Sequence, residues 1–149
     1  MQKVYPITWT DTITLFNKYE DPQTNLITWH RTIIDKCFWK NTGNKINIGS
    51  VVIGTNDIIC RIPENDNFME KHNWINIPND MMHKYFTLGI GDIIVRDSVQ
   101  DDINEYVSGK RSSDLINKYK NLQGCFLIEQ MSINTGIGRC APHYFAKGV

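Results

Sequence analysis

The sequence contains no apolar run long enough to cross a membrane, since no window approaches the roughly 18 consecutive apolar residues of a spanning helix. Residues 1–6 also lack the apolar core of a secretory signal peptide. Charge of either sign is not in excess, because 16 Lys and Arg balance 16 Asp and Glu. Without net positive charge there is no broad field for non-specific phosphate binding, which argues against a free-standing DNA-binding protein. We expect a protein made in the cytosol that does not bind membranes.

Complete catalytic and metal-binding motifs are missing as well. The glycine pairs at 89–91 and 136–138 do not complete a phosphate-binding loop and are typical of turns. Cys140 and His143 have the spacing of half a zinc site, with His72 and His83 as conceivable further ligands, but no second closely spaced pair completes it. No Gly-x-Ser-x-Gly elbow marks a nucleophilic serine. We therefore predict no enzyme activity, no catalytic residue, no cofactor and no metal site.

Cysteine is scarce, and the few cysteines are scattered through apolar, strand-like segments. They are Cys37, Cys60, Cys125 and Cys140. In a reducing compartment such residues behave as small buried hydrophobic side chains. We expect free thiols.

Aromatic and β-branched residues gather in short runs that are typical of strands. Residues 12–21 and 28–39 are two such runs across a short polar gap, and they predict a β-hairpin. Residues 54–57 fit either a tight turn or a bend in one long strand, and we favour a bend or bulge. Residues 40–45 are predicted to be a polar connection. Further strands are predicted at 50–53, 57–62, 93–96, 125–131 and 143–146.

Residues 112–119 predict a short helix. Ser112 or Ser113 can cap it, and Leu115, Ile116 and Tyr119 follow with helical spacing. About six or seven strands with one short helix favour a mainly β fold, an antiparallel β-barrel or sandwich with long loops. A βαβ fold would need helices between the strands. The length of 149 residues fits a single domain over residues 1–149.

Two long polar excursions, residues 64–85 and 97–110, interrupt the strands, and long ordered loops are disproportionately functional. Trp74 lies in the first excursion and Trp9 precedes the first strand. Tryptophan is enriched among the dominant contacts of interfaces, so these two are candidates for a subunit interface. The other two, Trp29 and Trp39, fall on predicted strands and are expected to pack the sheet.

The second excursion carries a set of carboxylates whose spacing does not match a calcium loop. Such a loop is more often a solvated surface than a metal centre. The four residues are Asp97, Asp101, Asp102 and Glu105.

Five stretches, taken in order, resemble a family of short virion proteins of tailed phages and prophages of Gram-positive bacteria. They cover nearly the whole chain. The stretches are residues 13–21, 29–34 with 38–39, 60–63, 88–96 and 143–148.

The resemblance implies a component of the head-to-tail connector, or neck, the stack of rings between the portal and the tail tube. The order of strands is also similar to that of head-closure or stopper proteins, small β-barrels assembled as rings around the DNA channel. It implies a homo-oligomeric ring that contacts portal or adaptor and tail proteins and surrounds packaged DNA without sequence-specific binding. It further implies assembly in the host cytoplasm and a final place in the virion.

Under this hypothesis one of the two excursions projects into the channel or onto an adjacent ring. Carboxylates at Asp97, Asp101, Asp102 and Glu105 would then repel phosphate and let DNA slide. The alternatives are a tail-terminator or tail-completion ring, a small metal-dependent phage nuclease, and a monomeric host-interaction protein.

Overall fold

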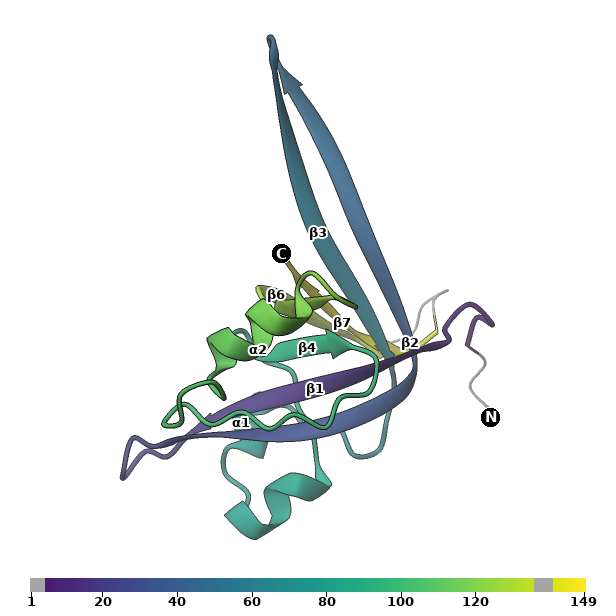
Figure 1. Cartoon of the computed structure of the whole chain (residues 1–149). Coiled ribbons are helices and arrows are strands. Elements are labelled where there is room, and N and C mark those ends of the chain that lie inside the picture. Colours follow the sequence, from purple (N-terminus) through teal and green to yellow (C-terminus); the bar gives the residue numbers. More distant parts are fainter. Residues whose placement is uncertain (1–4, 136–140) are drawn as a thin grey trace.

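The computed structural model describes residues 5–135 and 141–149, with the backbone alone for residues 43–48 and 51–56. Its strands are all antiparallel and form one seven-stranded sheet in the order β5-β4-β1-β2-β3-β7-β6 (Figure 1). The mainly β, antiparallel prediction is confirmed, in a sandwich-like form whose sheet is not closed into a barrel. The strands are β1 (Asp11–Glu20), β2 (Ile27–Ile48), β3 (Val51–Pro63), β4 (Ile93–Arg96), β5 (Cys125–Leu127), β6 (Gln130–Asn134) and β7 (His143–Gly148).

The sheet turns a corner in the long strand β2. Its first part pairs with β1, and its second part, from Phe38 onward, pairs with β3. Between the two parts the register with β1 shifts, because Ile34 lies opposite Ile13 while Cys37 lies opposite Asp11. Lys36 sits at this shift with φ of +60°, the left-handed conformation that bulges use to bend a strand. The strand therefore belongs to two half-sheets.

We call β5-β4-β1-β2 the covered half-sheet and β2-β3-β7-β6 the open half-sheet. Their inner faces meet in one apolar core to which both contribute. The alternation of inward and outward residues along each strand directs these side chains to the same side. The core consists of Ile13, Leu15, Ile34, Cys37, Trp39, Cys60, Ile62, Phe86, Leu88, Ile94, Phe126, Ile128, Tyr144 and Ala146.

Two edge strands follow one another in the chain, so the predicted strand at 125–131 is in fact two. β5 pairs with β4, and β6 pairs with β7. At the corner between them the Ile128 N–H donates to the Asp92 carbonyl at 2.8 Å, whereas the Glu129 N–H donates to the Lys147 carbonyl at 2.9 Å. The chain thus passes from one half-sheet to the other within two residues.

A second apolar layer covers the outer face of the covered half-sheet. The helix α2 (Ser112–Tyr119) has the bounds that the sequence predicts, and Leu115 and Tyr119 are buried on its inner side. Val99 and Ile103, from the segment before it, join the same cluster over β1, β4 and β5. Figure 1 shows α2 lying across this side of the sheet.

The caps of α2 differ from the sequence prediction. Neither serine side chain caps the helix. Instead the Glu105 carboxylate accepts from the Ser112 N–H at 3.2 Å, and Asp114 accepts from the Arg111 N–H at 3.1 Å. Carboxylates suit this position because the N-terminus of a helix carries free N–H groups and partial positive charge.

The excursion at 64–85 holds two further helical turns, α1 (Lys71–Trp74) and the 3-10 helix η1 (Asn79–Lys84), which the sequence analysis did not predict. Trp74 and Met82 are fully buried and anchor both turns to the body. None of the helices in the described ranges has the length and apolarity to span a membrane.

Beyond the body, β2 and β3 continue as a two-stranded arm, Thr42–Ile48 with Val51–Asp57, that projects away from the other strands (Figure 1). The prediction of a polar connection at 40–45 is wrong, because these residues continue β2. The prediction that 54–57 lie within one long strand is confirmed, although the pairing of β3 with β2 shows no bulge there.

Cys37, Cys60 and Cys125 are buried free thiols as expected, and burial raises the pKa of Cys125 to about 12. Cys140 lies outside the described residues.

Candidate interaction surface

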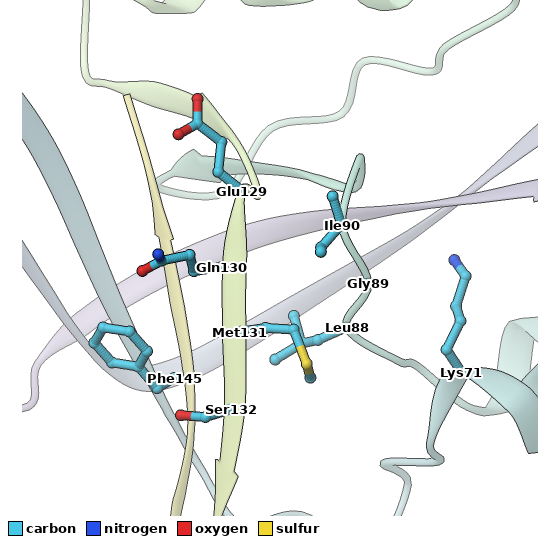
Figure 2. Close-up of a pocket in the computed structure, with 9 residues that line it drawn as sticks. All are labelled: Lys71, Leu88, Gly89, Ile90, Glu129, Gln130, Met131, Ser132 and Phe145. Atoms are coloured by element: carbon cyan, nitrogen blue, oxygen red, sulfur yellow. The ribbon is translucent and has the colours of Figure 1, made fainter.

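A groove of about 700 Å³ runs along the free edge of β6 and is also lined by Phe145 of β7 (Figure 2). One wall is β6 itself, and the other is the segment before β4, with Lys71 of α1 beyond it. Ile90 stands on this second wall with 76% of its surface exposed. The lining consists of Lys71, Leu88, Gly89, Ile90, Glu129, Gln130, Met131, Ser132 and Phe145.

The edge of β6 that faces the groove is open to pairing. In the part of the chain that the structure describes, β6 pairs with β7 and with no other strand. Proteins usually block such an edge with charged residues, proline or a bulge. The five residues of β6, Gln-Met-Ser-Ile-Asn, include neither charge nor proline. This edge therefore lacks the usual protection against an added strand.

A buried polar network fixes the second wall of the groove. Asn17, fully buried on β1, donates through Nδ2 to the Thr87 carbonyl at 2.6 Å and to Asp92 Oδ2 at 2.9 Å. Its Oδ1 accepts from the Thr87 N–H at 3.2 Å. Asp92 Oδ1 accepts from the Lys18 N–H at 2.9 Å. These bonds hold the loop between Thr87 and Asp92 against β1, since breaking any of them leaves a buried polar group without its partner.

Lys71 completes the network from the groove side. Its Nζ donates to the Lys18 carbonyl at 2.9 Å and lies 3.3 Å from Asp92 Oδ1. Its side chain crosses Gly89, where an added Cβ would lie 3.2 Å from Lys71 Cδ. Burial raises the pKa of Asp92, although Lys71 and the hydrogen bonds from Lys18 and Asn17 oppose that rise. The ammonium thus partly compensates a carboxyl whose surface is 1% exposed.

An aromatic row crosses the outer face of the open half-sheet next to the groove. The register places Phe38, Arg61, Phe145 and Ser132 side by side on successive strands. The Arg61 guanidinium carbon lies 5.2 Å from the Phe38 ring centroid and 5.8 Å from that of Phe145. Such cation–π contacts are favourable and leave a flat face of mixed apolar and cationic character. The groove and this row share Phe145, so they form one continuous surface.

Trp9, one of the two interface candidates, lies at the end of this row. Its ring centroid is 6.3 Å from that of Phe38 and 5.7 Å from that of His143, and its side chain is only half-buried. The residue is therefore available to a neighbouring subunit, and its interface role stays a prediction.

The second interface candidate needs correction. Trp74 is fully buried within the chain, donates from Nε1 to the Tyr85 carbonyl at 3.4 Å, and meets the rings of Tyr19 and His30 edge-on. A side chain without exposed surface cannot contact a second subunit. Burial lowers the pKa of His30, and the positive charges of His83 and Lys71 lower it further.

Three of the four carboxylates of the second excursion interact with side chains of α2 or β2. Asp101 accepts from the Tyr119 hydroxyl at 2.6 Å and from Lys118 Nζ at 2.8 Å. Asp102 pairs with Arg31 at 2.8 Å, and Glu105 accepts from Trp29 Nε1 at 3.1 Å. Asp97 accepts from the N–H of its neighbour Ser98. All four lie in the segment between β4 and α2, and their partners lie on α2, on β2 and in the segment itself. A channel-facing role for them stays a prediction.

The histidines proposed as conceivable zinc ligands do not come together with one another. His72 is exposed beside Glu70, His83 is exposed on η1, and His143 is buried with its Nδ1 2.7 Å from the Ala141 carbonyl. Across residues 5–135 and 141–149, no three His, Cys, Asp or Glu side chains are placed to hold a metal ion.

The fold and this surface define a mainly β protein with an open sheet edge beside an apolar groove. The chain belongs to the family of unknown function DUF6751, whose model matches residues 7–149. No curated protein and no solved structure matches it.

No sequence pattern predicted the groove, because its walls come from segments distant in the chain. Two local signals were available. Ile90 is a lone aliphatic residue between two glycines, and residues 130–134 form a strand-like run without charge. Neither signal predicts that the two segments face each other, because that depends on how the two half-sheets pack against each other.

Proposed function

We propose that this chain is a virion structural protein of the phage head-to-tail connector, a ring-forming subunit of the head-closure or stopper type. It joins the portal complex to the tail and encircles packaged DNA without reading its sequence. It acts by binding neighbouring subunits and adjacent rings, and no bond of a substrate is made or broken.

The observation that carries the proposal is the combination of the arm with the uncovered face of the open half-sheet. An isolated two-stranded hairpin is marginally stable in water, so an arm of this length favours a partner that supports it. The open edge of β6 and the groove beside it also favour contact with another chain. A subunit built into a ring has such a partner on both sides.

The charge balance supports the same function. Equal numbers of acidic and basic residues give the chain no general attraction for phosphate. Asp97 and Asp102 are exposed on the outer layer of the covered half-sheet, although Asp102 is paired with Arg31. If that layer faces the channel, exposed carboxylates there disfavour tight contact with the DNA backbone.

Deleting the gene from the phage or prophage that carries it tests this proposal. We expect filled heads and separate tails of normal length, and restoration of joined particles when the protein is supplied in trans. Tails of abnormal length would favour the tail-terminator alternative. Normal infectious particles would contradict both, and loss of DNA replication or processing before head filling would favour the nuclease.

A further inference from the structure

We propose that the arm of one copy docks in the β6 groove of a second copy, where an arm strand pairs with the open edge of β6. This inference rests on the proposed function, because it names the contact that links neighbouring subunits of the ring. The occupant is the residues Thr42–Ile48 and Val51–Asp57 of the adjacent chain.

The arm cannot fill the groove of its own chain. β7 pairs with β3 only as far as Ile58, and β1 pairs with β2 only as far as Cys37. Beyond them the arm continues for seven cross-strand pairs, from Thr42 with Asp57 to Ile48 with Val51. At roughly 3.4 Å per residue it reaches about 20–25 Å past the body. Figure 1 shows it pointing away from the strands that form the groove, so its partner is another molecule.

The backbone register of the arm is regular. Its two strands pair without a shift from Thr42 with Asp57 to Ile48 with Val51. A regular two-stranded ribbon presents backbone N–H and C=O groups along each outer edge, and pairing with the open edge of β6 requires such a row.

The unpaired backbone edges of the arm and of β6 are also complementary. Both outer edges of the arm lack a neighbouring strand within the described residues, and β6 lacks one on its groove side. Adding a strand to an exposed sheet edge is an established mode of recognition, in which main-chain hydrogen bonds give affinity and side-chain pockets give specificity. Docking would convert the arm from two strands into part of a larger sheet, which is the condition for its stability.

The contact is heterologous, since an arm on one copy meets a groove on the next. Heterologous contacts build closed rings where the rotation between copies closes, and open filaments where it does not. A face-to-face dimer would instead use the same surface on both copies. The two arrangements are distinguishable by mixing variants.

The first variant, Ile90→Glu, puts a charge on the groove wall and leaves the arm intact. The control, Leu122→Glu, makes the same change at a residue that is 69% exposed and lies outside the groove. The second variant removes residues 45–54 and carries Thr55→Gly, which leaves Asn44 and the new glycine as a two-residue hairpin turn. Circular dichroism and thermal unfolding establish that each variant is folded.

Analytical ultracentrifugation of the whole chain then measures self-association. We expect oligomers for the wild type and for Leu122→Glu, and at least about tenfold weaker association for Ile90→Glu and for the arm-shortened variant, because each loses an anchoring part of the contact. Mixing the two defective variants should produce a 1:1 complex, since the intact arm of one meets the intact groove of the other. Mass spectrometry of the complex identifies both chains.

Three outcomes overturn the inference: a wild type that stays monomeric at all concentrations, full oligomers from the arm-shortened variant, or a mixture that forms no 1:1 complex. Oligomers that ignore both changes point to the face-to-face arrangement. These outcomes leave the connector function standing, because that function fails on the deletion phenotype of the phage. Conversely, if the two variants form the 1:1 complex but deletion of the gene leaves normal infectious particles, the contact between arm and groove is supported and the connector function is contradicted.

Discussion

The two half-sheets differ in whether the chain itself covers their outer face. Over the covered half-sheet, Val99, Ile103, Leu115 and Tyr119 form a second layer that buries Phe16, so the chain satisfies this face by itself. The open half-sheet carries its aromatic row outward and extends into an arm with no neighbouring strand among the described residues. One antiparallel sheet thus has a half stabilised within the chain and a half whose surface suits a partner. Substitutions on the two halves should accordingly differ in kind, affecting folding on one and assembly on the other.

The largest effect is expected where the covering layer is anchored. Leu115→Ala removes a buried side chain from the interface of α2 with the sheet and should lower the free energy of unfolding by about 2–4 kcal/mol. Phe145→Ala, on the outward row, should cost less because that ring is only half-buried. Urea unfolding of both variants at a concentration where the wild type is monomeric measures the difference. Equal losses would contradict the distinction between the half-sheets.

The next effect concerns the seam where the half-sheets meet. A Cβ at Gly148 would collide with the Leu127 carbonyl and approach Phe126 Cδ2 at 2.5 Å, because the end of β7 passes directly over β5. Gly148→Ala should therefore destabilise the chain by about 1–3 kcal/mol through overpacking. Gly49→Ala is the control for glycine loss, since its Cβ would meet nothing within 4 Å, although φ of +61° there adds some backbone strain. Thermal unfolding that ranks Gly49→Ala as the more harmful change would refute the close approach at the seam.

Local patterns in the sequence predicted the elements whose causes are local. The first hairpin, β4 and the bounds of α2 follow from alternation, from β-branched residues and from helical spacing. The length of β2 did not, because Asn41, Thr42 and Gly43 read as a loop and pair with β3 only through the register of a long hairpin. The bulge at Lys36 was not predicted for a similar reason, because a lysine does not indicate the left-handed backbone conformation that the corner requires.

The candidate site was less accessible to prediction than the fold. Trp74 was predicted to lie in an interface because it belongs to a polar excursion. It is buried instead, because α1 packs against Tyr19 and His30. The four carboxylates looked like one acidic loop, but each has a different partner. Those partners are up to 76 residues away, as for Glu105 with Trp29, and no local pattern specifies such pairings.

A smaller effect, dependent on pH, is expected at the wall of the groove. Lys71→Met removes the cation beside buried Asp92 and should lower the free energy of unfolding at pH 7 by about 1–2 kcal/mol, less than for a fully buried pair because Lys71 is 34% exposed. Without the ammonium the folded pKa of Asp92, already raised by burial, rises further. Asp92 is protonated in both states below its unfolded pKa, so the loss should shrink as pH falls toward that value.

Lys18→Met is the matched control, because Lys18 contacts Asp92 through its backbone N–H rather than its ammonium. Chemical unfolding of the two variants and the wild type between pH 7 and pH 4 measures the effect. A loss at Lys71→Met that is independent of pH would show that packing over Gly89, and not the charge on Asp92, accounts for it.

The smallest effect separates structural from exposed carboxylates on the covered half-sheet. Burial opposes ionisation of Asp101, but the hydrogen bonds from Lys118 and Tyr119 outweigh it and lower the pKa of Asp101. A lowered folded pKa contributes stability above the unfolded value and loses it as pH falls through the folded value. Asp101→Asn should therefore cost about 0.5–1 kcal/mol at pH 7 and progressively less in acid, since the site remains accessible to water.

Asp102→Asn should cost less than about 0.5 kcal/mol at pH 7, because the Asp102 side chain is 82% exposed and surface ion pairs contribute little. The comparison of the two variants by thermal unfolding tests whether the acidic segment is held by Asp101 on the α2 side. If Asp102→Asn lowers the free energy of unfolding more than Asp101→Asn does, the ion pair between Arg31 and Asp102 stabilises this segment more than the bonds of Asp101 do. The exposed carboxylate would then be part of the scaffold and a poorer candidate for contact with a channel.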